Sequence, residues 1–197
     1  MLNHWMKPVS VVVVLVFLAL ALPSLASAEA HGNLNFLLGL KRMSENDWEP
    51  VENQRELGIL ADWGSKSWPI HIATDFLISK DDEGSSGEDV DGKTWELAAG
   101  VRKVWYKHEH VRPYVGGGIN LVHAKLEVED SAGQVDDKDK GIGAWIGGGL
   151  YYRIGPVFQI GAALRYSYAK VDLFGEDVNA GGLHYGLLLG FGWPGDE

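Results

Sequence analysis

Seven ionisable residues stand at alternate positions within otherwise apolar segments of the sequence. They are Glu56, Asp62, His71, Asp75, Glu96, Arg102 and Arg165. Successive side chains of a β-strand point to opposite faces, so the alternation places these groups on one face and the apolar residues on the other. Acids and bases that share a face can pair where water is scarce, which predicts a structural polar network. The alternative is a gated ion path or a ligand pocket through the same groups.

Ser167 and His184 are the residues best suited to covalent chemistry. A serine beside a histidine and an acid can act as a nucleophile, and barrel enzymes that deacylate or acylate lipid A need such a set near the membrane surface. The segments that carry Ser167 and His184 follow each other in the sequence, so we expect them to be adjacent. No local motif of either enzyme class surrounds them. The sequence therefore predicts no enzymatic activity, with a lipid-modifying enzyme as an alternative.

Three stretches offer ligands for metal ions. Residues 81–92 are rich in acids, but these acids do not follow the offsets of a calcium-binding EF-hand loop. Asp136, Asp137 and Asp139 offer at best a weak, exchangeable cation bridge to lipopolysaccharide phosphates. His108 and His110 flank Glu109 in a short turn, which favours hydration over metal binding. We expect no metal site and no cofactor.

The elements that carry these residues are strands. Segments of roughly ten residues with apolar residues at every second position recur eight times, which is the period of a β-strand. They cover about residues 33–41, 55–63, 68–79, 95–105, 111–128, 141–152, 158–168 and 184–193. The segment at 111–128 is long enough to need a bulge or an end that projects above its neighbours.

The links between the segments alternate in length. Residues 42–54, 80–93, 129–139 and 172–179 form long polar links, whereas the links near 64, 108 and 154 are short. Every long link joins an odd segment to the next even one, as in an up-and-down barrel. This predicts an all-β fold, an eight-stranded antiparallel up-and-down transmembrane β-barrel. The alternative is a soluble periplasmic barrel with its apolar face turned inward around an apolar ligand.

The first 28 residues have the composition of a secretory signal peptide. Lys7 precedes an apolar run, and Ala26, Ser27 and Ala28 offer a cleavage site. We therefore expect residues 1–28 to be removed and residues 29–197 to form one barrel domain. The chain has no cysteine and a formal net charge of −10. An acidic chain without a basic stripe argues against nucleic acid as a partner.

The end of the chain supplies a family resemblance. His184, Gly186, Leu189 and Phe191 follow the pattern polar, glycine, apolar and aromatic that resembles the C-terminal assembly signal of outer-membrane barrels. Together with residues 112–118 (RPYVGGG), this resembles the outer-membrane β-barrel domain family, to which the transmembrane domain of OmpA also belongs. Four residues follow Trp193, whereas the family usually stops near the aromatic residue.

The resemblance implies an integral protein of the outer membrane of a Gram-negative bacterium. It implies contact with outer-membrane lipid and lipopolysaccharide, and with the barrel-assembly machinery during insertion. If the first strand starts in the periplasm, the long loops are extracellular, and the short turns and both mature termini are periplasmic. Because eight strands enclose a space that side chains fill, a general porin is not expected. We expect a structural or surface-interaction role with an unnamed loop partner, the alternative being a narrow small-solute channel.

Overall fold

The structure, a computed structural model, describes residues 30–43, 48, 51–65, 67–85, 88–106, 108–130 and 133–193. The predicted signal peptide and the four residues after Trp193 lie outside the described residues. Nine strands run through the described part of the chain: β1 (Ala30–Met43), β2 (Asn53–Ser65), β3 (His71–Ser85), β4 (Glu88–Val104), β5 (Val111–Asp130), β6 (Gly133–Ile154), β7 (Phe158–Leu173), β8 (Glu176–Asn179) and β9 (Gly182–Trp193). No helix among these residues is long and apolar enough to cross a membrane.

Eight of these strands form a closed antiparallel barrel. Their order is β6-β5-β4-β3-β2-β1-β9-β7, and an additional pairing of β6 with β7 closes the wall. The first and last strands of the barrel meet in register, with Leu34 opposite Phe191. The short β8 pairs only with the end of β7, as a hairpin. Closure pairs the wall's backbone groups internally, which a lipid environment requires, and the predicted eight-stranded up-and-down barrel is confirmed.

The apolar face of the wall points outward. Along β7 the exposed residues alternate with buried ones, so that Ile160 and Leu164 lie outside while Gln159 and Arg165 lie inside. The same outer surface exposes Ile142, Ile146 and Leu187 by 68–79% of their area. The alternative of a soluble barrel with an apolar interior is therefore wrong, because the charged face is the one that lines the interior.

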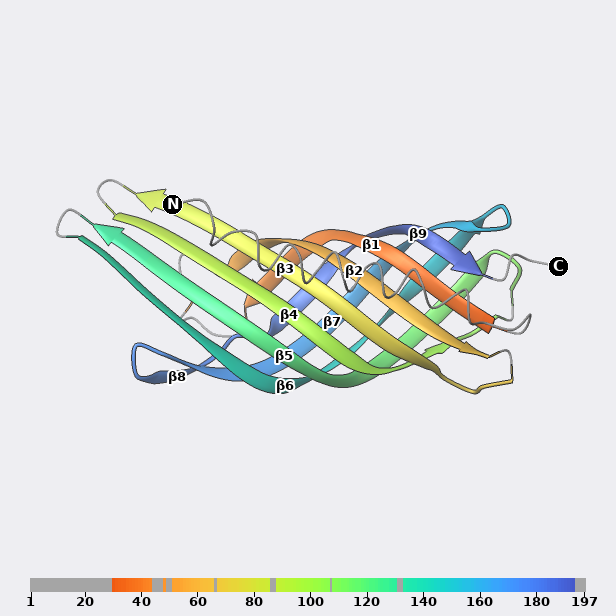
Figure 1. The fold of residues 1–197 in the computed structure, drawn as a ribbon. Helices are drawn as coiled ribbons and strands as arrows, with labels where there is room; N and C mark the ends of the chain where they lie inside the picture. The colour runs from red at the N-terminus through yellow and green to blue at the C-terminus, as the bar shows by residue number, and fades with distance from the viewer. Residues whose placement is uncertain are drawn as a thin grey trace, which may run out of the picture.

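Four strands continue past the rest of the barrel (Figure 1). β2 pairs with β3 only as far as Lys80, although β3 runs on to Ser85. β7 pairs with β6 only from Gly143, although β6 starts at Gly133. We call residues 80–85, 88–93, 125–130 and 133–138 the projecting sheet.

The projecting sheet corrects the prediction of long polar loops at 80–93 and 129–139. Both stretches belong mostly to paired strands: β3 and β4 pair out to Ser85 and Glu88, and β5 and β6 pair out to Asp130 and Gly133. Outside lipid a strand needs no apolar face, so polar residues on both faces are compatible with pairing. The link predicted at 172–179 is likewise a hairpin, since a turn at Phe174 and Gly175 joins β7 to β8.

Of the two explanations offered for the length of the fifth segment, the structure has the projecting end. β5 has no bulge against β4, because their pairing advances residue by residue from Tyr114 to Asp130. The start of the third segment differs from the prediction. β3 begins at His71, since Trp68 belongs to the preceding turn and donates its backbone N–H to the Ser65 carbonyl at 2.9 Å. A Cβ at Gly118 would collide with the Ala99 carbonyl, so the glycines of β5 permit a close approach of strands.

Candidate functional site: the lumen network

The half of the lumen nearer the short turns holds a connected set of charges. Asp62 accepts from His71 Nδ1 at 2.7 Å on one carboxylate oxygen and from Arg102 at 3.2 Å on the other. The other terminal nitrogen of Arg102 reaches both oxygens of Asp75 at 2.9 Å. Asn33 adds a donor to Asp62 at 2.9 Å. One guanidinium thus joins carboxylates from β2 and β3.

The set continues toward the hairpin end without a break. Arg165 on β7 donates to Asp75 on β3 at 3.0 Å and also to Glu96 on β4. It therefore links β7 to the opposite wall across the lumen. Glu96 then accepts from the Ser167 hydroxyl at 3.0 Å. His184 lies 2.8 Å from Ser167 Oγ through Nε2 and 2.6 Å from Glu56 through Nδ1. Ser79 donates to Glu56 at 2.8 Å.

We call this hydrogen-bonded set the lumen network. Its members are Glu56, Asp62, His71, Asp75, Ser79, Glu96, Arg102, Arg165, Ser167 and His184. All seven ionisable residues singled out by alternation lie in it, and all are buried. The structure therefore brings together groups from β2, β3, β4, β7 and β9 that are up to 128 residues apart in sequence.

Several buried polar residues of the interior were missed by the sequence reasoning. Lys41 donates to the Thr94 hydroxyl at 3.0 Å and to the Ala180 carbonyl at 2.8 Å. Arg112 and Arg153 are also buried near the short-turn end. The signal was present for Lys41, because it shares the parity of Asn33 and Asn35 on the same strand. The prediction assigned Asn33, Asn35, Leu37 and Gly39 to the inward face of that strand and left out the next residue of the same parity, Lys41.

An apolar cluster closes the hairpin end of the interior, and we call it the outer cap. It consists of Met43, Trp48, Val51, Val122, Ala124, Ala169, Val171, Leu173, Val178 and Ala180. Trp48 is 1% exposed, and its indole N–H donates to the Asn179 carbonyl at 3.0 Å. This bond joins Trp48 to the β7–β8 hairpin. Alternation could not predict the cap, because Trp48 lies outside any strand.

The interior leaves little room for water beside the charges. Asp62 is fully buried, and Arg102 and Glu96 are each 1% exposed. Tyr114 and Tyr151 stack at 4.4 Å between ring centroids, with the Arg102 guanidinium 5.2 Å from the Tyr114 ring. Buried charges are stable only when they are paired and hydrogen-bonded, and here each carboxylate of the network meets a cation, an imidazole or a hydroxyl.

Ser167 and His184 lie on adjacent strands, as predicted, and their side chains are in contact. Glu56 on the other side of the imidazole, which was not predicted, gives the three residues the connectivity of a serine, histidine and acid relay. Two features oppose nucleophilic chemistry. Ser167 is fully buried, so no substrate carbonyl has space beside its hydroxyl. The Ser167 hydroxyl also donates its hydrogen bond to the Glu96 carboxylate, so its proton is not directed at the imidazole. The geometry suits a structural bond better than an activated nucleophile.

The possible metal ligands remain apart in the described part of the chain, which holds no group of three or more histidine or acidic residues arranged around an ion. His108, Glu109 and His110 are exposed in the turn between β4 and β5. Asp137 and Asp139 instead accept backbone N–H groups of the β7–β8 hairpin, from Phe174 at 2.6 Å and Asp172 at 2.8 Å. The backbone N–H of Asp172, and after it that of Lys140, holds the pKa of Asp139 below its usual value, because each favours the charged carboxylate.

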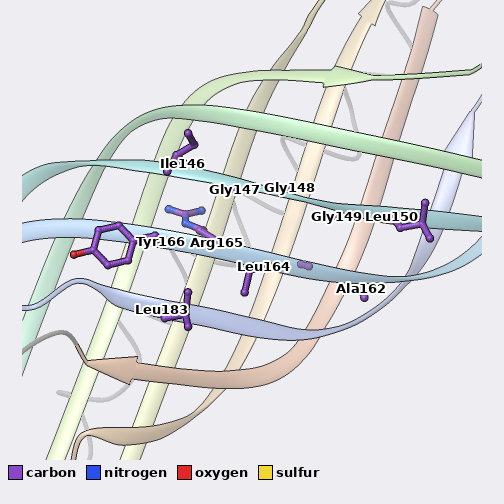
Figure 2. Close-up of a pocket in the computed structure, with 11 residues that line it drawn as sticks. Ile146, Gly147, Gly148, Gly149, Leu150, Ala162, Leu164, Arg165, Tyr166 and Leu183 are labelled. Atoms are coloured by element: carbon purple, nitrogen blue, oxygen red, sulfur yellow. The ribbon is translucent and has the colours of Figure 1, made fainter.

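A shallow groove lies on the outer wall rather than in the lumen (Figure 2). Glycines 147–149 of β6 leave it open, and Ile146, Leu164 and Leu183 line it on the exposed face. Arg165 and Tyr166 also line it, but Arg165 is bound to Asp75 and Glu96 inside the barrel. The exposed lining is therefore mostly apolar.

Comparison with known families identifies the chain. A family model described as the outer membrane protein beta-barrel domain matches residues 12–193. The chain belongs to this family. As a member of the outer membrane protein beta-barrel domain family, it is an integral protein of the outer membrane, and its apolar outer wall faces lipid. No curated protein matches it.

Solved structures show the same fold at low sequence identity. The attachment invasion locus protein Ail of Yersinia pestis is 19% identical, with a TM-score of 0.59 over 84% of this chain and 99% of Ail. A major outer membrane protein of Thermus thermophilus is 10% identical, with a TM-score of 0.55 over 85% of this chain and 99% of that one. Neisserial surface protein A is 18% identical, with a TM-score of 0.52 over 83% and 94%.

The residues of the suggested assembly signal lie on β9, the strand that closes the barrel. His184 points into the lumen network, whereas Leu189 and Phe191 are exposed on the outer wall by 43% and 46%. Gly186 lies opposite Gly39 of β1 and Ala163 of β7. Recognition of this strand by an assembly machinery stays a prediction.

Proposed function

We propose that this protein is a closed, non-conducting and non-enzymatic barrel that stabilises the outer membrane or presents its hairpins to a surface partner. The observation that carries the proposal is the filling of the interior. Charged side chains from opposite walls bond to one another, and the outer cap lies above them. Moving an ion through this interior would require breaking paired, buried charges, each at a cost of several kcal/mol.

The orientation is part of the proposal. The start of β1, the end of β9 and the short turns after β2, β4 and β6 lie at one end of the barrel, and the β3–β4 and β5–β6 hairpins lie at the other (Figure 1). A chain that enters from the periplasm would keep its termini there and place the hairpins outside. We also propose lipopolysaccharide around the wall and the assembly machinery at β9 as partners.

The names of two structural relatives support a surface role as the one to test. Ail is called an attachment invasion locus protein, and one Ail structure contains the heparin analogue sucrose octasulfate. Neisserial surface protein A carries its location in its name. At these identities the likeness itself concerns the fold, so the partner has to be found by experiment.

Planar bilayer recording of the refolded protein tests the closed interior. We expect no unitary conductance above the lipid background at neutral pH. Reproducible single-channel steps would contradict the proposal and favour a narrow channel. Cleavage of the hairpins by protease added to intact cells tests the orientation, with cells expressing no barrel as the control.

Lipid A mass spectrometry tests the absence of enzymatic activity. We expect the same lipid A species in cells that express the wild type, the Ser167→Ala variant or no barrel. A change of acylation that needs the Ser167 hydroxyl would overturn this part of the proposal.

A further inference from the structure

The turn at the tip of the β7–β8 hairpin holds an aromatic residue where the backbone disfavours one. Phe174 has a φ of 55° and Gly175 a φ of 84°, and Leu173 pairs with Glu176 across this two-residue turn. Two successive positive φ angles mark the tight hairpin turn that favours asparagine or glycine at its first position. A bulky side chain is strained there. Among the described residues, no other residue except glycine has a positive φ.

Packing against the barrel does not explain this phenylalanine. The Phe174 side chain is 51% exposed, whereas its neighbour Leu173 is buried in the outer cap. The tip is nevertheless held in place, because the Phe174 N–H donates to Asp137 at 2.6 Å and the Gly175 N–H donates to Asp172 at 3.1 Å. The fold thus keeps an aromatic ring at the surface on a strained backbone. Such strain is found at positions that serve function rather than stability.

Three valines lie in register on the inner face of the projecting sheet. Val90 pairs with Val128, and Val128 pairs with Val135. They share their face with Leu126, which packs against the outer cap. Val135 is 59% exposed, and the other two are partly buried. We call Val90, Val128 and Val135 the valine row. A strand beyond the lipid needs no apolar face, so its own position in the fold does not require such a row.

The valine row and Phe174 belong to one surface above the outer cap. The β7–β8 hairpin lies at the same end of the barrel as the projecting sheet (Figure 1). Asp137, which binds the Phe174 N–H, is two residues from Val135 on the same face of β6, or about 7 Å along the strand. Neighbouring strands are about 4.8 Å apart, so the valine row spans about 10 Å across the sheet. We call the valine row and Phe174 the apolar patch.

Acids surround the apolar patch. In the rung next to the valine row, Asp81 and Asp137 stand at the two ends, with Gly92 and Leu126 between them. Glu176 and Asp177 are exposed directly after the hairpin turn. The lysines of the projecting sheet stand at the alternate positions, on its other face. An apolar surface with an acidic rim is complementary to a partner that presents apolar side chains flanked by basic ones.

We propose that the apolar patch binds an amphipathic helix with basic flanks from a partner protein. A helix rises 5.4 Å per turn, which is close to the spacing of about 4.8 Å between strands. A helix that crosses the sheet therefore places one apolar side chain of each turn over a successive valine. Phe174 stands beside the row as a preorganised aromatic anchor. The inference rests on the proposed function, since it names the kind of surface partner that the hairpins meet outside the cell.

The competing explanation is an ordinary surface with scattered apolar residues. Single exposed apolar side chains are common on proteins. This explanation accounts for Val135 or Phe174 taken alone. It does not account for a strained turn that exposes a phenylalanine beside three valines in register. It also predicts that polar replacements in the patch leave the binding of any peptide unchanged.

The experiment measures binding of a synthetic helical peptide to the full mature barrel. The probe is a fluorescent peptide of leucine and lysine about four turns long, with leucines at every third or fourth position. Fluorescence anisotropy follows its binding to the barrel in phosphatidylcholine nanodiscs, with empty nanodiscs as the background. Two matched peptides have glutamate in place of lysine, or serine in place of leucine.

The variant Phe174→Asn separates binding from folding. Asparagine suits the positive φ, so the midpoint of urea unfolding should stay the same or rise. Binding of the leucine and lysine peptide should weaken about thirty-fold, as for loss of an aromatic anchor. A lower midpoint would show that Phe174 serves packing, and an unchanged affinity would show that it is no anchor. Either result would overturn the proposal.

A pair of isosteric variants tests the valine row. Val135→Thr should weaken binding of the same peptide about fourfold, because it replaces one methyl group of the patch by a hydroxyl. Val157→Thr is the matched control, since Val157 is 44% exposed in the turn between β6 and β7 at the opposite end. It should bind like the wild type. Equal effects of the two replacements would contradict binding at the patch.

The three peptides compared on the wild type need no variant, so this comparison stays decisive if a variant does not fold. We expect saturable binding of the leucine and lysine peptide and at least about tenfold weaker binding of the two others. Equal binding of the glutamate peptide, or of the serine peptide, would overturn the proposal. Because the barrel is purified, the outcome is independent of conductance and of orientation in cells, which test the proposed function separately.

Discussion

The lumen network and the projecting sheet contain the same kinds of charged residue in opposite surroundings. Inside the barrel, Asp62 and Arg102 are fully or almost fully buried, and the guanidinium also meets Asp75. In the projecting sheet, Lys80 and Asp91 form a comparable ion pair, but their side chains are 50% and 42% exposed. Water screens the second pair and not the first. The same ion-pair contact therefore stabilises the fold strongly only where no water can solvate its charges.

Arg102→Met should have the largest effect, because it leaves Asp62 and Asp75 buried without their shared cation. We expect a loss of about 3–5 kcal/mol in the free energy of unfolding. Urea unfolding of the barrel in detergent micelles measures it. A loss below about 1 kcal/mol would mean that the lumen solvates its carboxylates by other means and that the two regions differ less than we conclude.

Trp48→Ala tests the boundary between the two regions, where the outer cap separates the network from the hairpin side. The indole is buried and bonded to the Asn179 carbonyl, so its removal should cost about 3 kcal/mol in unfolding free energy. Trp68→Ala is the matched control, because Trp68 is 52% exposed in a turn and should cost far less. Equal losses for the two variants would indicate that the cap is not packed as described.

Asp137→Asn with Asp139→Asn should loosen the β7–β8 hairpin without unfolding the barrel. Their carboxylates accept the Phe174 and Asp172 N–H groups, and hydrogen exchange of these two amides should become several times faster. The effect should persist at moderate salt, because direct contacts are screened far less than charges a Debye length apart. Exchange rates that stay unchanged would show that backbone pairing of β7 with β8 holds the hairpin alone.

Acid should produce the same loosening in the wild type. The folded pKa of Asp139 lies below its ordinary value of 3.8, so its contribution is fully present above about pH 4 and is lost as the pH falls through the folded pKa. Exchange of the Asp172 amide, corrected for the intrinsic pH dependence, should therefore rise only below that range. A rise near neutral pH would point to a different group.

Lys80→Met should have the smallest effect, since it removes an exposed ion pair. The expected change in unfolding free energy is below about 1 kcal/mol. The measurement is the same urea titration as for Arg102→Met, which makes the two values directly comparable. A loss as large as that of the buried arginine would remove the distinction between the regions.

The barrel could be predicted because its physical cause is local and repeated. Lipid on one side and a charged interior on the other impose a period of two on every strand, and residues such as Leu164 and Arg165 record it directly. The same parity placed seven charges from four segments in the lumen. It could not give their partners, because contacts such as Glu56 with His184 depend on the shear of the closed wall.

Outside the lipid, a strand no longer needs an apolar face. The alternation of apolar and polar residues ends there, and strands can no longer be predicted from it. Residues 80–93 looked like a loop because acids and lysines occupy both faces, yet they pair as strands out to Ser85 and Glu88. The burial of Trp48 was not predicted for a different reason. Trp48 lies outside any strand, so no alternation of neighbouring residues indicates which way its side chain points. Both failures concern parts of the chain whose position is set by water or by distant packing.

The projection of four strands beyond the closed wall affects how neighbouring copies of the protein can pair in one membrane. The barrel wall has no edges, but the projecting sheet has one along β3, because β2 pairs with β3 only as far as Lys80. The opposite side, along β6, is contacted by the β7–β8 hairpin through Asp137 and Asp139. An unpaired edge invites strand addition between neighbouring copies. The sequence DDEGS along the β3 edge has three acids and no base, which makes that encounter electrostatically unfavourable. The acidic residues of this edge thus disfavour strand pairing between neighbouring barrels in the membrane.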